Sequence, residues 1–466
     1  MYIGLLVQII SNCSTIFQLL LPSFLYFRLC MQTLEQLENG QLVGATHIKI
    51  AEELTQFPNV LFSLVNTLEI LDLSNNRLSS LPTDFDRFKK LRILFLSNNQ
   101  FTEFPTVLSR CENLEMIGFK ANFIENIPEN SLPLATRWLI LTQNKIQQLP
   151  NSIGNCNRLQ KLMLAGNCLT NLPTSLQQCK NLQLLRISAN QLFELPKWLY
   201  SMPHLAWLAF AGNPFSYIPK SVARISEIDY DDLKLKELLG QGASGIISKA
   251  TLKNDQSQKD VAVKVFKGEV TSDGLPKDEM LACLHAGEHQ HLVKILGKII
   301  NHPEEKDGLV MELMDNDFTN LANPPSFETC TRDVFVKHHS FSIDAILFII
   351  QPIASVAFQL HKSGVMHGDL YAHNILINKN FEPLFGDFGA ASLYNTDETI
   401  VANALQKIEV KAFGCLLDDL LQHVNELHQA SPIFHTLCSL RDRCMMMEIE
   451  QRPSFGDIIL ELKNSK

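Results

Sequence analysis

Two short motifs in the last third of the sequence contain the residue types that handle a metal ion and a proton. The first, His367–Leu376, reads HGDLYAHNIL and places Asp369 five positions before Asn374. The second is the run GDFG, in which Asp387 precedes Phe and Gly. A carboxylate can accept a proton from a hydroxyl group, and carboxylate and amide oxygens are suitable ligands for Mg²⁺. Phosphoryl transfer requires such groups, because the transferring phosphate needs positioning and charge neutralisation more than covalent help.

A glycine-rich segment and a lysine precede these motifs. Gly240, Gly242 and Gly245 form the pattern GxGxxG between two strand-like runs, and the run VAVK ends at Lys264. Small glycines let backbone amides approach phosphate groups, and a lysine can hold the α- and β-phosphates. The glycine pattern alone is a weak signal, because glycine-rich turns are common. Its position ahead of Lys264 and the acidic motifs gives it weight.

From Leu235 to about Leu462 these motifs follow the order found in protein kinases, and this half of the chain resembles that superfamily. The resemblance implies a bilobal α+β fold that uses ATP and Mg²⁺. It makes Asp369 the base that accepts the proton of the substrate hydroxyl, with Lys264 and Asn374 as its catalytic companions. Asn374 and Asp387 become the metal ligands.

The resemblance also assigns residues to the nucleotide site. Glu279, on the predicted helix after Lys264, is the expected acidic partner of that lysine, and Asp278 remains the alternative. Ile247 and Ala262 stand where the family usually contacts adenine. The implied cofactor-binding set is Gly240, Gly242, Gly245, Ile247, Ala262, Lys264, Glu279 and the hinge residue Glu312.

Three departures from the family pattern predict unusual control. Gly368 replaces the arginine that often pairs with a phosphorylated activation loop, so activity is expected not to depend on that modification. Tyr371 stands where Ser/Thr kinases usually carry lysine, and Tyr371→Lys is expected to raise turnover. The segment between Asp387 and Glu409 is short and lacks Ala-Pro-Glu, which predicts an abbreviated substrate platform. Glu409 itself resembles the residue, usually Asp, on the helix that supports the catalytic loop.

These residues favour an ATP-dependent protein kinase that acts on Ser/Thr in a protein substrate. Retention of Lys264, Asp369, Asn374 and Asp387 argues for an enzyme. Tyr371 and the short segment argue for the alternative, a pseudokinase that binds nucleotide and serves as an interaction scaffold. Tyrosine specificity also stays open.

Upstream of these motifs the sequence repeats itself. The segment LEILDLSNNRL (68–78) fits the template LxxLxLxxNxL, and six in-phase copies follow. The repeated asparagines are Asn76, Asn99, Asn122, Asn144, Asn167, Asn190 and Asn213, spaced by 23 residues with one spacing of 22. The array resembles leucine-rich repeats, whose asparagines satisfy backbone groups in the turn after each short strand. No single repeat closes a core, so the copies must stack.

The non-consensus strand positions are expected to face the concave side of the solenoid. Apolar side chains gather in two columns there, including Phe95, Met116, Trp138 and Trp207. Exposed apolar ribbons usually mark an interface, so these four residues predict a protein partner on the concave face. The alternative is that a terminal segment or the second domain covers the ribbon.

Composition and charge narrow the remaining possibilities. The net charge of −9 disfavours nucleic-acid binding, because phosphate backbones repel an acidic surface. The 11 scattered cysteines fit reduced thiols in a cytoplasmic protein better than a disulfide framework or a zinc site. No apolar run between the repeats and the kinase-like half could cross a membrane, so both halves are expected to share one compartment.

The sequence therefore predicts an α/β leucine-rich-repeat solenoid followed by an α+β bilobal protein-kinase fold. Residues 31–66 are the predicted cap, 67–225 the repeats, 226–234 a linker and 235–463 the kinase domain. Residues 1–30 are apolar, with no charged side chain before Arg28. They predict a membrane anchor or, alternatively, an extension upstream of a true start at Met31.

Overall fold

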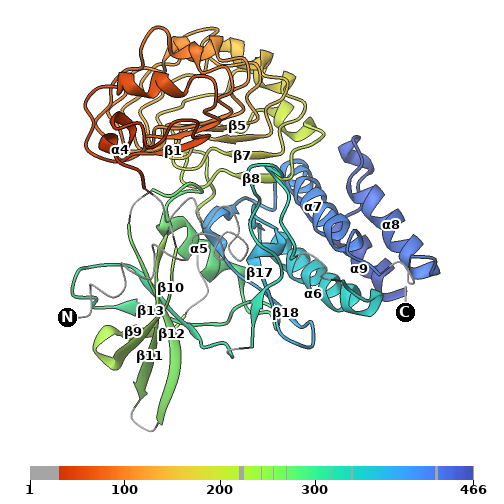
Figure 1. Cartoon of the computed structure of the whole chain (residues 1–466). Helices are drawn as coiled ribbons and strands as arrows, with labels where there is room; N and C mark the ends of the chain where they lie inside the picture. Colours follow the sequence, from red (N-terminus) through yellow and green to blue (C-terminus); the bar gives the residue numbers. More distant parts are fainter. Residues whose placement is uncertain are drawn as a thin grey trace.

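The computed structural model describes residues 31–219, 225–242, 244–254, 257–268, 270–315, 317–336, 340–425 and 429–464. The apolar segment 1–30 lies outside this range, so its predicted role as anchor or extension is not addressed. Figure 1 shows the repeats, in red to yellow, stacked against a second half in green and blue.

The N-terminal half is a parallel solenoid. Its strands are β1 (His47–Lys49), β2 (Ile70–Asp72), β3 (Ile93–Phe95), β4 (Met116–Gly118), β5 (Trp138–Ile140), β6 (Lys161–Met163), β7 (Leu184–Arg186) and β8 (Trp207–Ala209). They pair in sequence order, all parallel. β1 belongs to the degenerate first copy and extends the same sheet, as expected of a cap. A short helix, α4 (Leu34–Glu38), precedes it with a capping box at Thr33.

Short 3₁₀ helices form the outer side of the solenoid. They are η1 (Asn59–Leu64), η2 (Phe85–Arg87), η3 (Thr106–Arg110), η4 (Asn151–Asn155), η5 (Thr174–Gln178) and η6 (Lys197–Ser201). The repeated proline precedes most of them, as Pro105 does before η3, because it presets φ and needs no hydrogen-bond acceptor.

The asparagine ladder has the role that the repeat pattern predicted. Asn122 donates from Nδ2 to the carbonyls of Leu96 (2.9 Å) and Phe119 (3.1 Å), and its Oδ1 accepts from the amide of Phe101 (3.0 Å). Each buried asparagine therefore joins its own turn to the preceding repeat and satisfies backbone groups of both.

The second half begins with a six-stranded sheet. Its strands are β9 (Glu227–Asp229), β10 (Leu233–Gln241), β11 (Gly245–Asn254), β12 (Ser257–Phe266), β13 (Ile295–Ile300) and β14 (Gly308–Glu312), in the order β10-β11-β12-β14-β13-β9. Helix α5 (Pro276–Ala286) follows β12. Residues 226–234, predicted as a linker, belong to this sheet: β9 pairs in parallel with β13, and Ile228 packs on the core of the sheet.

A helical lobe completes the second half. Its helices are α6 (Ile343–Lys362), α7 (Thr399–Leu421), α8 (Pro432–Cys444) and α9 (Phe455–Asn464). Its short strands are β15 (Thr319–Asn320), β16 (Val365–Met366), β17 (Ile375–Ile377), β18 (Pro383–Phe385) and β19 (Ser392–Leu393). By length and composition α6 is the one helix, among the described residues, that could cross a membrane. However, 61% of its apolar window is buried inside the protein, as expected of a core helix.

The two halves share their apolar cores. Met366 and Leu405 of the helical lobe pack into the repeat core, while Leu184 and Trp207 of the repeats pack into the core of the lobe. Figure 1 shows β8, the last strand of the solenoid, beside α7. Across the same boundary, Arg452 donates to the carbonyl of Pro203 (2.7 Å). Direct packing of this kind requires both halves to lie in one compartment.

Part of the concave face is covered by the chain itself, which is the alternative that the sequence left open, whereas Phe95 and Trp138 remain half-buried. Trp207 is 1% exposed and Met116 is 3% exposed. The ring of Phe95 lies 6.0 Å from that of Phe327, which belongs to the segment between β15 and α6. Trp138 lies under the ammonium of its neighbour Lys161, 4.2 Å from the ring centre. The apolar ribbon is an interface, but its main partner is the second half of the same chain.

Candidate active site

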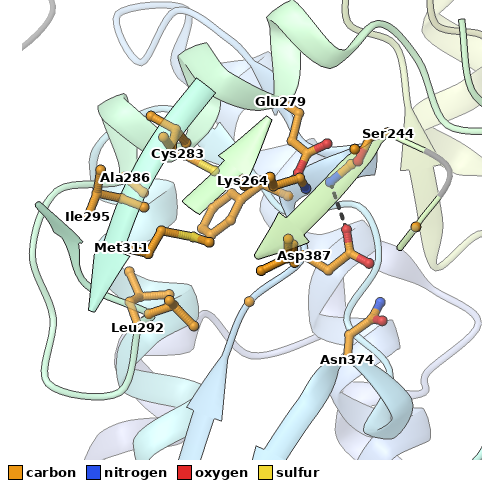
Figure 2. Close-up of a pocket in the computed structure, with 18 of the residues that line it drawn as sticks. Ser244, Lys264, Glu279, Cys283, Ala286, Leu292, Ile295, Met311, Asn374 and Asp387 are labelled. Carbon is orange, nitrogen blue, oxygen red and sulfur yellow. Dashed lines mark hydrogen bonds and ion pairs between the residues drawn. The ribbon is translucent and has the colours of Figure 1, made fainter. Parts of the chain in front are cut away.

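A buried ion pair lies at the centre of the cleft between the sheet and the helical lobe. Lys264, on β12, donates from Nζ to the carboxylate of Glu279 on α5. Glu279 is 3% exposed, and Figure 2 shows the two side chains pointing toward each other. Burial disfavours the ammonium, but the charge and hydrogen bond of Glu279 and the charge of Asp387 together outweigh burial and raise the pKa of Lys264. Asp278, the alternative partner, points away toward Gly212 of the repeats.

A cavity of about 340 Å³ opens beside this pair. Its lining includes Gly242, Gly245, Ile247 and Met311, together with the polar groups named below. The lining is mainly apolar with a few convergent charges, which is the character of a small-molecule pocket.

Three residues of the predicted cofactor set lie outside this lining. Gly240 faces open space. Ala262 is buried opposite Met311 in the sheet, and the side chain of Glu312 forms a surface ion pair with Lys259 (3.1 Å). The structure therefore gathers the other five residues of the set around the cavity and leaves the side chain of Glu312 at the surface.

The catalytic loop brings Asp369 and Asn374 together. Asn374 donates from Nδ2 to Oδ2 of Asp369 (2.8 Å) and to its backbone carbonyl (3.0 Å). This geometry leaves the amide oxygen of Asn374 available as an acceptor. The side chain of Asp369 is 18% exposed, so a substrate hydroxyl has an approach to it.

Asp387 also lines the cavity, near Asn374 (Figure 2). It follows β18 with a left-handed backbone (φ 57°), and its Oδ1 accepts from the amide of Gly389 (3.2 Å). Asp387 and Asn374 both line the cavity and offer carboxylate and amide oxygens, the donors that Mg²⁺ prefers (Figure 2). The residues present therefore fit a magnesium site.

Buried polar groups support the catalytic loop. Glu409 of α7 accepts from the amides of Gly368 (2.7 Å) and His367 (3.3 Å), and lies 2.8 Å from Nε2 of His361. The imidazole of His367 stacks on Phe385 with ring centres 4.0 Å apart. Burial lowers the pKa of His367. Glu409 thus performs the supporting role that its position in the sequence predicted.

One arginine of the repeats reaches into this site, and the sequence interpretation missed it. Arg186, at the end of β7, donates from Nη2 to Oδ1 of Asp369. It also donates from Nε to Asp273 (2.7 Å) and from Nη1 to the carbonyl of Gly368 (2.9 Å). Its side chain is 1% exposed. A usable signal existed: Arg186 shares a strand column with the apolar Phe95, Ile140 and Met163, and a cation among apolar side chains requires an acidic partner.

The same docking explains Gly368. Its φ is 72°, and a Cβ atom there would lie 2.6 Å from the carbonyl oxygen of Leu208 in β8 and 2.7 Å from that of Ala390. No larger residue fits between the catalytic loop and the repeats. The arginine that many kinases carry at this place is therefore excluded by packing.

Tyr371 does not face the phosphate site, which corrects the expectation drawn from its place in the motif. Its ring stacks on Trp207 at 4.2 Å with an angle of 6°, and it is 4% exposed. The indole of Trp207 donates to the carbonyl of Leu370 (3.1 Å). A lysine at position 371 would bury its charge in this interface, so Tyr371→Lys is expected to destabilise the docking rather than raise turnover.

Comparisons with known proteins agree with this architecture. A family model described as protein tyrosine and serine/threonine kinase matches residues 233–414, and two leucine-rich-repeat models match residues 66–110 and 135–192. The chain contains leucine-rich repeats followed by a protein kinase domain. Its relatives are receptor-like and serine/threonine kinases.

The relatives are distant and longer than the matched region. A probable serine/threonine-protein kinase of Dictyostelium discoideum, kinY, is 24% identical over 296 residues, which cover 51% of this chain and 48% of that protein. Cysteine-rich receptor-like protein kinase 36 of Arabidopsis thaliana is 30% identical over 176 residues, 36% of this chain and 24% of that protein. The chain spans less than half the length of these relatives.

A solved structure was also matched. A leucine-rich-repeat protein of Leptospira interrogans is 27% identical with a TM-score of 0.33, covering 39% of this chain and 53% of that one.

Proposed function

We propose that this chain is an ATP-dependent protein kinase that phosphorylates serine or threonine in a protein substrate. The observation that carries the proposal is the joint placement of Lys264, Glu279, Asn374 and Asp387 around one cavity, with Asp369 bonded to Asn374. Lys264 would hold the nucleotide phosphates, and Asp369 would accept the proton of the substrate hydroxyl. Magnesium ions, held by Asn374 and Asp387, supply charge neutralisation for the phosphate groups.

The repeats bear on partners and location. Leucine-rich repeats are protein-binding modules, so a protein partner of the solenoid is part of the proposal, on surfaces that the kinase domain leaves free. We place the protein in the cytoplasm, because reduced cysteines and a kinase site are both typical of that compartment. Membrane attachment would then depend on residues 1–30.

A nucleotide-binding scaffold is the second candidate, and one observation favours it. Both carboxylate oxygens of Asp369 already have partners, Arg186 on Oδ1 and Asn374 on Oδ2. If these bonds kept the substrate hydroxyl away, the protein would bind nucleotide without transferring phosphate.

A transfer assay distinguishes the two. The full chain is incubated with γ-labelled ATP, Mg²⁺ and dephosphorylated casein, beside Asp369→Asn and the matched control Asp397→Asn, an exposed aspartate of the same lobe. Transfer that Asp369→Asn abolishes and Asp397→Asn retains supports the kinase, and phosphoamino-acid analysis of the product tests Ser/Thr against Tyr. Equal background transfer by all three, with ATP still bound, supports the scaffold.

A further inference from the structure

The cation of the catalytic loop itself, His373, is paired with Asp333 (2.7 Å) and does not contact Asp369. The flanking positions hold Gly368 and Leu370, and Tyr371 is turned into the interface with Trp207. Arg186, contributed from β7 of the repeats, supplies the guanidinium that contacts the carboxylate. The positive charge nearest to the proposed base therefore comes from another domain.

The geometry of Arg186 is that of a fixed clamp. Its planar guanidinium is nearly inaccessible to solvent and uses its Nε, Nη1 and Nη2 atoms on three different groups. Two of these, Gly368 and Asp369, belong to the catalytic loop, and the third, Asp273, precedes α5. A guanidinium with several directional bonds loses little freedom and fixes its partners firmly.

The contact with Arg186 leaves hydrogen-bond acceptor sites free on the carboxylate of Asp369. An ionised carboxylate has about four lone-pair sites on its two oxygens, and Arg186 and Asn374 take one bond each on different oxygens. Asp369 can therefore still accept a hydroxyl proton, and its partial exposure leaves an approach. A contact that blocked the base would have to cover it, and this one orients it.

The interface around Arg186 is closely packed. Gly368 fits only under the backbone of β8, and Trp207 lies flat on Tyr371 inside a core shared by both halves. Apolar interfaces with a shared core are typical of permanent contacts rather than of removable lids. The Lys264–Glu279 pair, required for an assembled kinase site, is formed with the repeats docked.

We propose that Arg186 is the positioning residue of the base Asp369, so that the kinase site is complete only when the repeat array is docked. The proposal rests on the proposed function. It makes the repeats part of the catalytic apparatus in addition to any role in binding partners.

The test compares Arg186→Gln and Arg186→Lys with the matched control Thr331→Val. The control removes a hydrogen bond of the same interface, from Thr331 Oγ1 to Gln183 (2.7 Å), without touching the catalytic loop. Steady-state transfer from ATP to casein gives kcat and the KM for ATP in the full chain. We expect Arg186→Gln to lower kcat by about 10- to 100-fold, the usual effect of a misplaced catalytic group. The KM for ATP should stay within about twofold, because Arg186 does not contact Lys264 or Glu279.

Recovery of kcat by a lysine at position 186 is the second part of the test. Arg186→Lys keeps the charge and should recover part of the lost kcat, while Thr331→Val should resemble the wild type. A kcat that rises in Arg186→Gln would show that the arginine blocks the base and would overturn the proposal. An equal fall in Thr331→Val, or no advantage of lysine over glutamine, would reduce Arg186 to an ordinary interface residue. A wild-type chain that transfers no phosphate contradicts the proposed function, and this inference with it.

A second variant covers the case in which Arg186→Gln does not fold, since its loss leaves Asp369 and Asp273 without their cation. Asp273→Ala removes the acceptor of Nε and leaves the Arg186–Asp369 contact in place. We expect a smaller fall in kcat than for Arg186→Gln, with circular dichroism unchanged. A folded Asp273→Ala chain with wild-type kcat would overturn the clamp.

Discussion

Replacement of Trp207 by alanine should weaken the whole molecule, because this side chain joins the repeats to the catalytic loop. Trp207 is 1% exposed, stacks on Tyr371 at 4.2 Å and donates to the carbonyl of Leu370. Truncation of a buried aromatic side chain costs about 3–5 kcal/mol, and the lost stacking contributes about 0.5–1.5 kcal/mol. These terms overlap, so we expect the free energy of unfolding to fall by about 4 kcal/mol.

Trp138→Ala is the matched control. Trp138 occupies the same strand column but is only half-buried, and its neighbours Lys161 and Met163 belong to the repeats. Its truncation should cost about 1–2 kcal/mol. Urea unfolding of the two variants and the wild type, followed by far-UV circular dichroism, gives both values. If Trp207→Ala costs no more than Trp138→Ala, the docking of the repeats on the catalytic loop is refuted.

Three further predictions concern packing, charge and control. Gly368→Ala should destabilise the chain by about 3 kcal/mol more than Gly268→Ala in thermal or urea unfolding. Both glycines have positive φ, but only at Gly368 would a Cβ atom clash with neighbouring backbone. Equal losses of stability would contradict the close approach of β8. Burial lowers the pKa of Lys161 from 10.5 to about 8, so the unfolded chain binds this proton more tightly and stability should rise between pH 8 and 10.5, by up to about 3 kcal/mol. Lys161→Met should lack this rise, and parallel pH curves for the two proteins would count against it. Phosphatase treatment should leave kcat unchanged, since Gly368 offers no guanidinium to a phosphorylated loop; a large loss of activity would show otherwise.

Local structure could be predicted from the sequence wherever a pattern is local. The asparagine period located each strand of the solenoid, because one repeat determines its own turn and the next copy can only stack on it. The kinase motifs similarly predicted which residues would gather at the cavity, including the pairing of Lys264 with Glu279.

The docking of the two halves could not be predicted, because it depends on surfaces far apart in the sequence. Arg186 and Asp369 are separated by 183 positions, and no sequence pattern links the two residues. Gly368 and Tyr371 were recognised as unusual, but their reason is steric and lies in β8. The column containing Trp207 correctly predicted an interface, but the choice between a separate protein and the second domain could not be made, since an apolar ribbon carries no information about what covers it.

Hydrogen–deuterium exchange of β8 tests the central claim, that the repeats dock on the catalytic loop, most directly. The amides of Phe210 and Ala211 both donate to Oγ of Ser392 in the kinase domain (2.9 and 3.1 Å). In an undocked solenoid these amides, at the end of the last strand, would face water. Peptides spanning residues 205–212 should therefore exchange slowly in the wild-type chain and quickly in Trp207→Ala. Fast exchange of these peptides in the wild type would contradict the account.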